Sequence, residues 1–310
     1  MKINCLILAV LSAAMLFSAC KNGKPESVEV HPVDGDAVEI PDGPAAGPVV
    51  ETAYDLEALA GMLTGCSYVE NFKNGVAAIQ KDGEWRYIDK MGHFVDRVSE
   101  EEDSDQAGLD ELFSQYESHG QFREGMCWVY RDYGIGYIDE KGELVIPCQY
   151  EWAVEHSPCD FHEGVCPVLT IPERELFSYI DKTGQLAFPG FYSTESNFSE
   201  GLAGVRQFFM DGDDVTGTQP GYIDHTGKMV ILLTDNDFGY PFHDGAAKVS
   251  NWLDDTAWFI DKSGNKLFDL DLTRFYRSTD NSFSEGLCAI CDKEGRWGFI
   301  DKTGRSTFDF

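Results

Sequence analysis

Basic side chains are scarce in this chain of 310 residues. Its 24 lysines and arginines face 54 aspartates and glutamates, which gives a formal net charge of −30. Such a surface repels the phosphate groups of nucleic acids and of anionic lipids, which excludes general nucleic-acid binding. Cysteine is also sparse, and nine residues are too few at this length for a small disulfide-stabilised scaffold. The 43% of hydrophobic residues is typical of a folded globular protein.

The longest apolar run, Ile3–Phe17, is too short to span a membrane. It follows Lys2 and leads into Ser18-Ala19-Cys20, features typical of a signal peptide. Residues 16–20 resemble the lipobox of bacterial lipoproteins. That resemblance implies removal of residues 1–19 and lipidation of Cys20, which then attaches the protein to the membrane of the bacterial cell envelope. Ordinary secretory cleavage near residues 12–14 is the alternative.

Two segments separate this leader from the main body of the chain. Residues 20–50 contain five prolines and four glycines and few large apolar side chains, so we expect a flexible tether. Residues 51–65 place leucines at helical spacing and predict a short helix. Thr52 is its candidate N-cap, and Asp55 completes a capping box.

Residues 66–310 are dominated by six copies of one unit. Its first half is Phe-x-acid-Gly followed by a strand of small and β-branched residues. The copies begin at Phe72, Phe122, Phe161, Phe198, Phe242 and Phe283, and the first has Asn74 in place of the acid. The second half is aromatic-Ile-Asp-x-x-Gly. Its Asp and Gly residues are Asp89 and Gly92, Asp139 and Gly142, Asp181 and Gly184, Asp224 and Gly227, Asp261 and Gly264, and Asp301 and Gly304.

The second half of the unit predicts a tight turn. Asp at its first position caps backbone N–H groups, and Gly at its fourth accepts a positive φ. Strands before and after this turn make each unit about three antiparallel strands. One such sheet cannot bury both faces, so neighbouring units must stack. The chain is therefore predicted to be an all-β repeat protein.

The segment Gly295-Arg296-Trp297-Gly298-Phe299-Ile300-Asp301 resembles the consensus of the WG-repeat family of bacterial proteins. Residues 83–89 match as well, with Arg86 in place of the glycine, and the middle copies drift further. The resemblance covers residues 66–310 and implies a scaffold without a general catalytic motif. Six units favour a β-propeller-like ring, and an open β-solenoid is the alternative.

A second helical insert is expected at about residues 99–118. It begins with an acidic run and continues into Leu109, Leu112, Phe113 and Tyr116, which are spaced as on an amphipathic helix. Such a helix either packs on a sheet edge or projects toward a partner.

Chemical motifs are few, and we predict no catalytic residue, metal site or cofactor. Cys288 and Cys291 form a single CxxC, but on a strand they point to opposite faces. A disulfide between Cys159 and Cys166 stays open. The histidines form no HxH or HExxH pattern, and the acidic clusters lack the spacing of a calcium loop.

Six tryptophans are present. Those in the Trp-Gly position are expected in the core, whereas Trp128, Trp152 and Trp252 lie outside it and are candidates for a ligand surface. We expect a non-catalytic envelope lipoprotein whose repeats bind another macromolecule, most simply a protein. A cell-surface glycan-binding protein is the alternative, and a hydrolase of envelope polymers, with two carboxylates across a cleft, is a weaker one.

Overall fold

The computed structural model describes residues 53–95, 112–152, 159–193, 196–276 and 282–310. The leader, Cys20, the tether and residues 99–111 of the second insert lie outside these ranges. Within the described residues, no helix is long and apolar enough to cross a membrane. The repeat region belongs to one compact unit that comprises residues 50–310.

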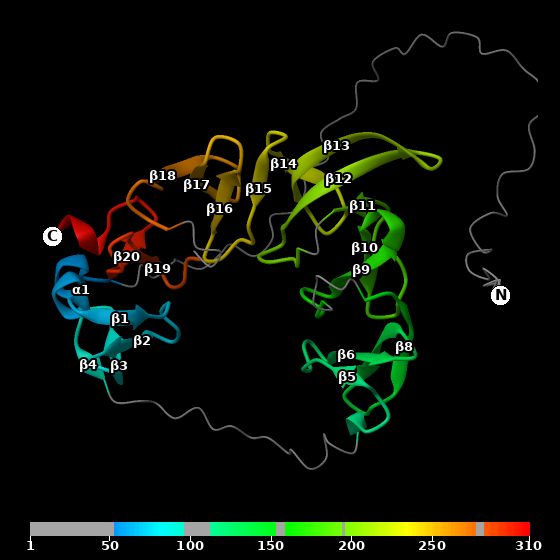
Figure 1. The fold of residues 1–310 in the computed structure, drawn as a ribbon, viewed down its shortest axis with the longest axis horizontal. Coiled ribbons are helices and arrows are strands. Elements are labelled where there is room, and N and C mark those ends of the chain that lie inside the picture. The colour runs from blue at the N-terminus through cyan, green and yellow to red at the C-terminus, as the bar shows by residue number, and fades with distance from the viewer. Residues whose placement is uncertain (1–52, 96–111, 153–158, 194–195, 277–281) are drawn as a thin grey trace, which may run out of the picture. The chain divides into compact units, whose positions relative to one another are not determined.

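Three repeats form four-stranded antiparallel sheets in which sequential strands are neighbours (Figure 1). Repeat 1 holds β1 (Cys66–Val69), β2 (Val76–Lys81), β3 (Glu84–Asp89) and β4 (Phe94–Val95). Repeat 2 holds β5 (Ser118–His119), β6 (Met126–Arg131), β7 (Gly134–Asp139) and β8 (Leu144–Tyr150). Repeat 5 holds β15 (Asp237–Gly239), β16 (Ala246–Asn251), β17 (Thr256–Asp261) and β18 (Lys266–Leu270). The expected three strands were too few for these repeats, because a short strand also precedes each Phe-x-acid-Gly turn.

Repeats 3 and 4 share one sheet of six strands. Repeat 3 contributes β9 (Val165–Ile171) and β10 (Leu176–Asp181). Repeat 4 contributes β11 (Phe191–Tyr192), β12 (Ala203–Asp211), β13 (Asp214–Ile223) and β14 (Met229–Leu232). The link between them is the pairing of Phe177 in β10 with Tyr192 in β11. Repeat 6 has β19 (Leu287–Cys291) and β20 (Trp297–Asp301), flanked by single bridges at Phe275 and Ser306.

The strand after each Phe-x-acid-Gly turn forms the core of its repeat. Two of its residues, spaced two apart, point to one face and are almost completely buried in all six copies. They are Ala77 and Ile79, Cys127 and Val129, Cys166 and Val168, Ala203 and Val205, Ala247 and Val249, and Cys288 and Ile290.

The first insert folds as the helix α1 (Leu56–Leu63). Its N-cap is Asp55, whose carboxylate accepts a hydrogen bond from the amide of Ala58 at 3.0 Å. The prediction of Thr52 as the cap was wrong, because Asp55 itself satisfies the first free N–H groups of the helix. Leu56, Leu59 and Leu63 are buried on one face of the helix.

The second predicted helix ends earlier than its hydrophobic pattern suggested. Leu112 and Phe113 are helical, but β5 begins at Ser118, because the backbone there pairs with β6. Leu112, Phe113 and Tyr116 pack against Cys127 and Val129 of β6 and Ile138 of β7. These three side chains therefore cover the sheet of repeat 2 and do not project from it.

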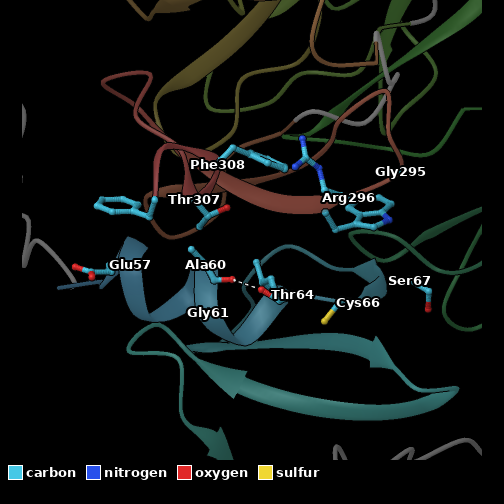
Figure 2. Close-up of a pocket in the computed structure, with 14 residues that line it drawn as sticks. Glu57, Ala60, Gly61, Thr64, Cys66, Ser67, Gly295, Arg296, Thr307 and Phe308 are labelled. Atoms are coloured by element: carbon cyan, nitrogen blue, oxygen red, sulfur yellow. Dashed lines mark hydrogen bonds between the residues drawn. The ribbon is translucent and has the colours of Figure 1, made fainter.

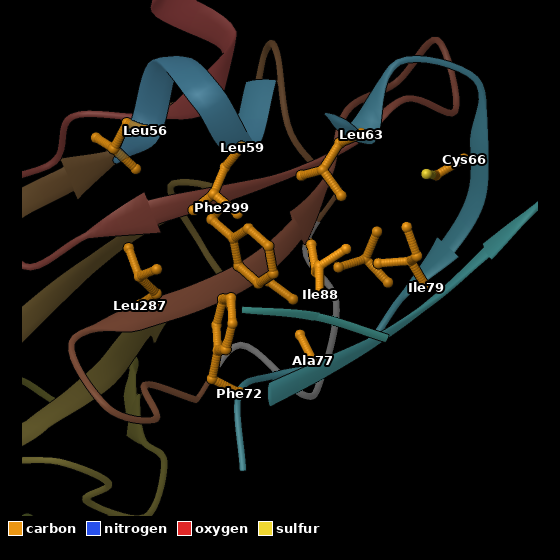
Figure 3. Packing of buried hydrophobic residues seen from close by; sticks show 12 residues of the cluster. Leu56, Leu59, Leu63, Cys66, Phe72, Ala77, Ile79, Ile88, Leu287 and Phe299 are labelled. Carbon is orange, nitrogen blue, oxygen red and sulfur yellow. The ribbon is translucent and has the colours of Figure 1, made fainter. Parts of the chain in front are cut away.

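Repeat 1 packs against repeat 6, although the two lie at opposite ends of the repeat region. Leu287, Ala289 and Phe299 share a hydrophobic cluster with residues of α1 and repeat 1 (Figure 3). The backbone amide of Ala289 donates to Oδ1 of Asn71 at 2.7 Å. In an open solenoid the first repeat would contact only its sequence neighbour. The small sheets are instead arranged as a β-propeller, so the prediction of a ring is confirmed and the solenoid is wrong.

Candidate functional site

The six Asp-x-x-Gly turns are structural in this molecule. In each turn one carboxylate oxygen of the aspartate accepts hydrogen bonds from the backbone amides two and four residues later. In repeat 1 these donors are Met91 and His93, both at 2.9 Å from Oδ1 of Asp89. Gly92 adopts a φ of 76°, which a side chain at that position would strain. The turns therefore hold the hairpins together.

An aromatic surface lies where repeat 1 meets repeat 6. It comprises Tyr68 of β1, Trp85 of β3 and Trp297 of β20. The Tyr68 ring packs edge-on to both tryptophans, with ring centroids 5.9 Å from Trp85 and 5.0 Å from Trp297. Trp85 is 51% exposed and Tyr68 is 42% exposed. Three adjoining aromatic side chains of which two face solvent are a common ligand-binding arrangement.

A cavity of about 880 Å³ opens beside this surface (Figure 2). Its wall is formed by α1 and the following residues on one side and by repeat 6 with residues 307–310 on the other. Trp297 lines the cavity and also belongs to the aromatic surface, so the two features are continuous. The polar groups of the lining are the side chains of Glu57, Thr64, Ser67, Arg296 and Thr307.

Arg296 is held at the cavity edge by two carboxylates. Its guanidinium lies 2.7 Å from Oδ2 of Asp292 and 3.2 Å from Oε2 of Glu294. Burial raises the pKa of Asp292, but the backbone and side-chain hydrogen bonds from Arg296 outweigh it, so the pKa of Asp292 is lowered. Arg296 is thereby kept in one orientation while its side chain stays two-thirds exposed.

The tryptophans predicted as a ligand surface do not gather in one place. Trp128 and Trp152 are partly buried against the core of repeats 2 and 3, with their rings 5.8 Å apart and edge-on. Trp252 is 66% exposed in the turn after β16 of repeat 5. The expectation that tryptophans of the Trp-Gly position are core was wrong for Trp85. That residue lies near the start of β3, where the successive residues Glu84 and Trp85 are both exposed, so the alternation of residues along the strand does not reveal its exposure.

The buried cysteines are suited to packing. Burial raises the pKa of the Cys127 thiol to about 11 and that of Cys166 to about 12. Such thiols are protonated and unreactive near neutral pH. The Cys166 thiol donates a hydrogen bond to the carbonyl oxygen of Cys159 at 3.3 Å, so the disulfide considered for this pair is not formed in the structure. Among the described residues, no group of histidine, cysteine or acidic side chains is placed to hold a metal ion.

Comparison with known proteins finds a family to which parts of the repeat region are similar. The family described as "WG containing repeat" matches residues 66–85, 135–169 and 177–207. These segments are similar to WG repeats. The matched segments fall in repeats 1 to 4 and include two of the Asp-x-x-Gly turns, at Asp139 and Asp181. No curated protein matches the chain.

Several solved structures share a general similarity with this chain. A KlHsv2 variant with loop 6CD replaced by a Gly-Ser linker is 9% identical, with 76% of this chain and 79% of that chain covered and a TM-score of 0.32. A streptogramin B lyase is 14% identical, with 77% and 76% covered and a TM-score of 0.28. The WD40 β-propeller domain of Doa1 is 14% identical, with 75% and 91% covered and a TM-score of 0.22. Because these TM-scores lie below 0.5, the propeller assignment follows from the sheets and ring contacts of this chain.

Proposed function

We propose that this protein is an envelope lipoprotein whose WG-repeat propeller binds another macromolecule at the aromatic surface, without catalysing a reaction. The observation that carries the proposal is the exposure of Tyr68 and Trp85 beside the cavity edge at Trp297. Aromatic side chains supply large contact areas at a low cost in side-chain entropy. Adjoining exposed aromatic side chains are typical of an interaction surface.

The charge of the chain supports a protein partner with a basic contact surface. Acidic residues outnumber basic ones by more than two to one. At the cavity, Arg296 is already paired with Asp292 and Glu294, so its charge is compensated. A basic partner is therefore attracted to the propeller and oriented before its apolar groups contact the aromatic surface.

Site-specific cross-linking in living cells tests this binding site. A photoactivatable amino acid replaces Tyr68, and the same group replaces Tyr133 as a matched control, because Tyr133 is exposed in the β6–β7 turn of repeat 2. We expect one protein to be captured from position 68, none from position 133, and the capture to be lost when Trp85→Ala is added. Equal capture from both positions would contradict the site.

A glycan is the second candidate ligand, and the exposed rings of Trp85 and Tyr68 favour it, since sugar rings pack on aromatic faces. Isothermal titration of the purified protein with oligosaccharides from the envelope distinguishes the two. Heat release that disappears in Trp85→Ala and persists in Trp252→Ala would assign the aromatic surface to glycan binding.

The membrane anchor is tested separately. Cys20→Ala is expected to move the protein from the membrane fraction to the soluble fraction, because the lipid is attached to that thiol. Retention of the variant in the membrane fraction would contradict the anchor and leave the binding site untouched.

A further inference from the structure

Five junctions between repeats contain a recurring pair of aromatic rings. The aromatic residue of one Ile-Asp motif packs against the phenylalanine of the following Phe-x-acid-Gly turn, with ring centroids 4.9–5.3 Å apart. Both rings of every such pair are almost completely buried. The pairs are Tyr137–Phe161, Tyr179–Phe198, Tyr222–Phe242, Phe259–Phe283 and, from repeat 6 back to repeat 1, Phe299–Phe72.

A second recurring contact, here called the carboxylate clamp, joins the same repeats. The acid of one Phe-x-acid-Gly turn accepts a hydrogen bond from the glycine amide of the next such turn. The clamps are Glu124–Gly164, Glu163–Gly201, Glu200–Gly245, Asp244–Gly286 and Glu285–Gly75.

Most clamps also hold a basic side chain. This basic residue belongs to the repeat that supplies the glycine amide, and it directly follows the aspartate of that repeat's Ile-Asp motif. Lys182 lies 3.3 Å from Glu124, His225 lies 2.9 Å from Glu163, Lys302 lies 3.0 Å from Asp244, and Lys90 lies 2.6 Å from Glu285. Burial raises the pKa of Glu285, but the hydrogen bonds from Lys90 and from the amide of Gly75 lower it by more. The pKa of Glu285 is therefore below its ordinary value.

The backbone conformation of these turns bears on why an acid occupies the third position of Phe-x-acid-Gly. The acid has a φ of 51–55° in all the turns that carry one, and the next glycine has a φ of 73–92°. This two-residue turn favours Asn, Asp and Gly, whereas Glu at positive φ is disfavoured by about 1–2 kcal/mol. Glutamate nevertheless occupies four of the six copies. Both Glu and the shorter Asp244 reach the neighbouring repeat, so the hydrogen bond across the junction accounts for an acid at this position.

The junction between repeats 1 and 2 lacks both contacts. Asn74 stands in place of the acid, and Glu140 stands where the other repeats have Lys or His. No carboxylate among the described residues accepts a hydrogen bond from Gly125, and Glu140 is the side chain nearest to it. Tyr87 and Phe122 occupy the positions of the aromatic pair but are only partly buried. Phe122 lies instead 6.0 Å from Phe113, within repeat 2.

We propose that the junction between repeats 1 and 2 is a seam at which the ring opens, while the junction between repeats 6 and 1 is its permanent closure. At this junction the neutral Asn74 replaces the acid of the clamp, and the acidic Glu140 replaces its basic residue. Neither member of the charge pair is therefore present. Repeat 1 stays attached to repeat 6 through α1 and the cluster in Figure 3. Opening therefore separates repeat 1 from repeat 2.

Hydrogen–deuterium exchange of the intact chain tests the seam. Peptides covering the six Phe-x-acid-Gly turns are followed by mass spectrometry at one pH. The amide directly after each turn donates to a backbone carbonyl oxygen in all six copies, so these amides are compared. We expect the amide of Met126, next to Gly125, to exchange at least about tenfold faster than its counterparts, because only its turn loses a neighbouring repeat on opening. The counterparts are Val76, Val165, Leu202, Ala246 and Leu287. Equal protection of all six turns would overturn the proposal.

Two variants complete the test. Asn74→Glu combined with Glu140→Lys recreates the clamp and is expected to slow exchange at Gly125 about tenfold, while either change alone does not. Glu200→Asn copies the seam between repeats 4 and 5 and is expected to speed exchange at Gly245 without altering Gly125. Circular dichroism confirms that each variant is folded. A folded double variant whose Gly125 exchanges as fast as in the unmodified protein would contradict the proposal.

Discussion

The junctions on the two sides of repeat 1 differ in almost every contact. Toward repeat 6, Phe72 packs 4.9 Å from Phe299, and Glu285 joins the amide of Gly75 to the buried side chain of Lys90. Toward repeat 2, Asn74 provides no carboxylate. Repeats 1 and 6, the most distant in sequence, are therefore joined by more side-chain contacts than the sequence neighbours 1 and 2. Covalent connection between repeats 1 and 2 makes a strong noncovalent contact there unnecessary for holding the ring together.

The largest difference is expected from removing the aromatic rings of the two junctions. Phe72→Ala empties a fully buried site and should lower the free energy of unfolding by about 3–5 kcal/mol. Phe122→Ala at the other junction should cost about half as much or less, since that ring is partly exposed. Urea unfolding followed by tryptophan fluorescence measures both. Similar losses of unfolding free energy in the two variants would contradict the proposed difference between the two junctions.

Breaking the clamp at the closed junction is the next largest effect. Glu285→Gln leaves Lys90, whose side chain is 6% exposed, beside a neutral partner. We expect a loss of about 2–3 kcal/mol, at the low end for a buried pair because Glu285 is itself partly exposed. Glu140→Gln, at the open junction, serves as the control and should change stability by less than about 0.5 kcal/mol. A loss in the control as large as that of Glu285→Gln would contradict this comparison.

Acid should weaken the clamped junctions. In Glu124, burial raises the pKa, but the hydrogen bonds from the amides of Gly164 and Glu163 and from Lys182 lower it more, and the pKa of Glu285 is lowered in the same way. Unfolding returns both groups to an ordinary glutamate pKa. Their stabilisation is therefore complete above that ordinary value and is lost as the pH falls through the lowered pKa of the folded state.

Urea titrations at a series of pH values between about 6 and about 3 measure this loss of stability. Glu285→Gln should show a smaller fall in stability over this range than the unmodified protein. An identical pH dependence in the two proteins would show that the clamp carboxylate does not contribute.

The smallest effect on stability is expected at the aromatic surface. Trp85→Ala removes a ring that is half exposed, so the free energy of unfolding should change by less than about 1 kcal/mol. Capture of the partner from position 68 should nevertheless be lost. If Trp85→Ala destabilised the protein as much as Phe72→Ala does, Trp85 would be a core residue of the closed junction.

Much of this architecture could be predicted from the recurrence of short motifs. The Phe-x-acid-Gly and Ile-Asp-x-x-Gly spacings indicate hairpins, and burial in the strands between them follows the alternation of residues such as Ala77 and Ile79. The strands before each turn were missed because they are short and carry few β-branched residues. Ser118–His119 is one example, since its strand character comes from pairing with β6.

The clamp and the aromatic surface were harder to predict. The acid of Phe-x-acid-Gly could have been recognised from Glu124 and its counterparts, because glutamate is unsuited to a turn with positive φ. Its partner lies 38–45 residues away along the chain for most clamps, and more than 200 for Glu285. The aromatic surface joins Tyr68 to Trp297 across the closed ring, so only the folded chain brings them together.

A distance measurement across the two junctions tests the central claim most directly. Fluorescent labels on unnatural amino acids at Phe94 of repeat 1 and Tyr133 of repeat 2, both exposed, report the seam. Labels at Met91 of repeat 1 and Tyr276 of repeat 6, also exposed, report the closed junction. Single-molecule energy transfer should give a broad or two-peaked distribution for the first pair and one narrow peak for the second. A narrow distribution across both junctions, or a broader one between repeats 6 and 1, would contradict the account.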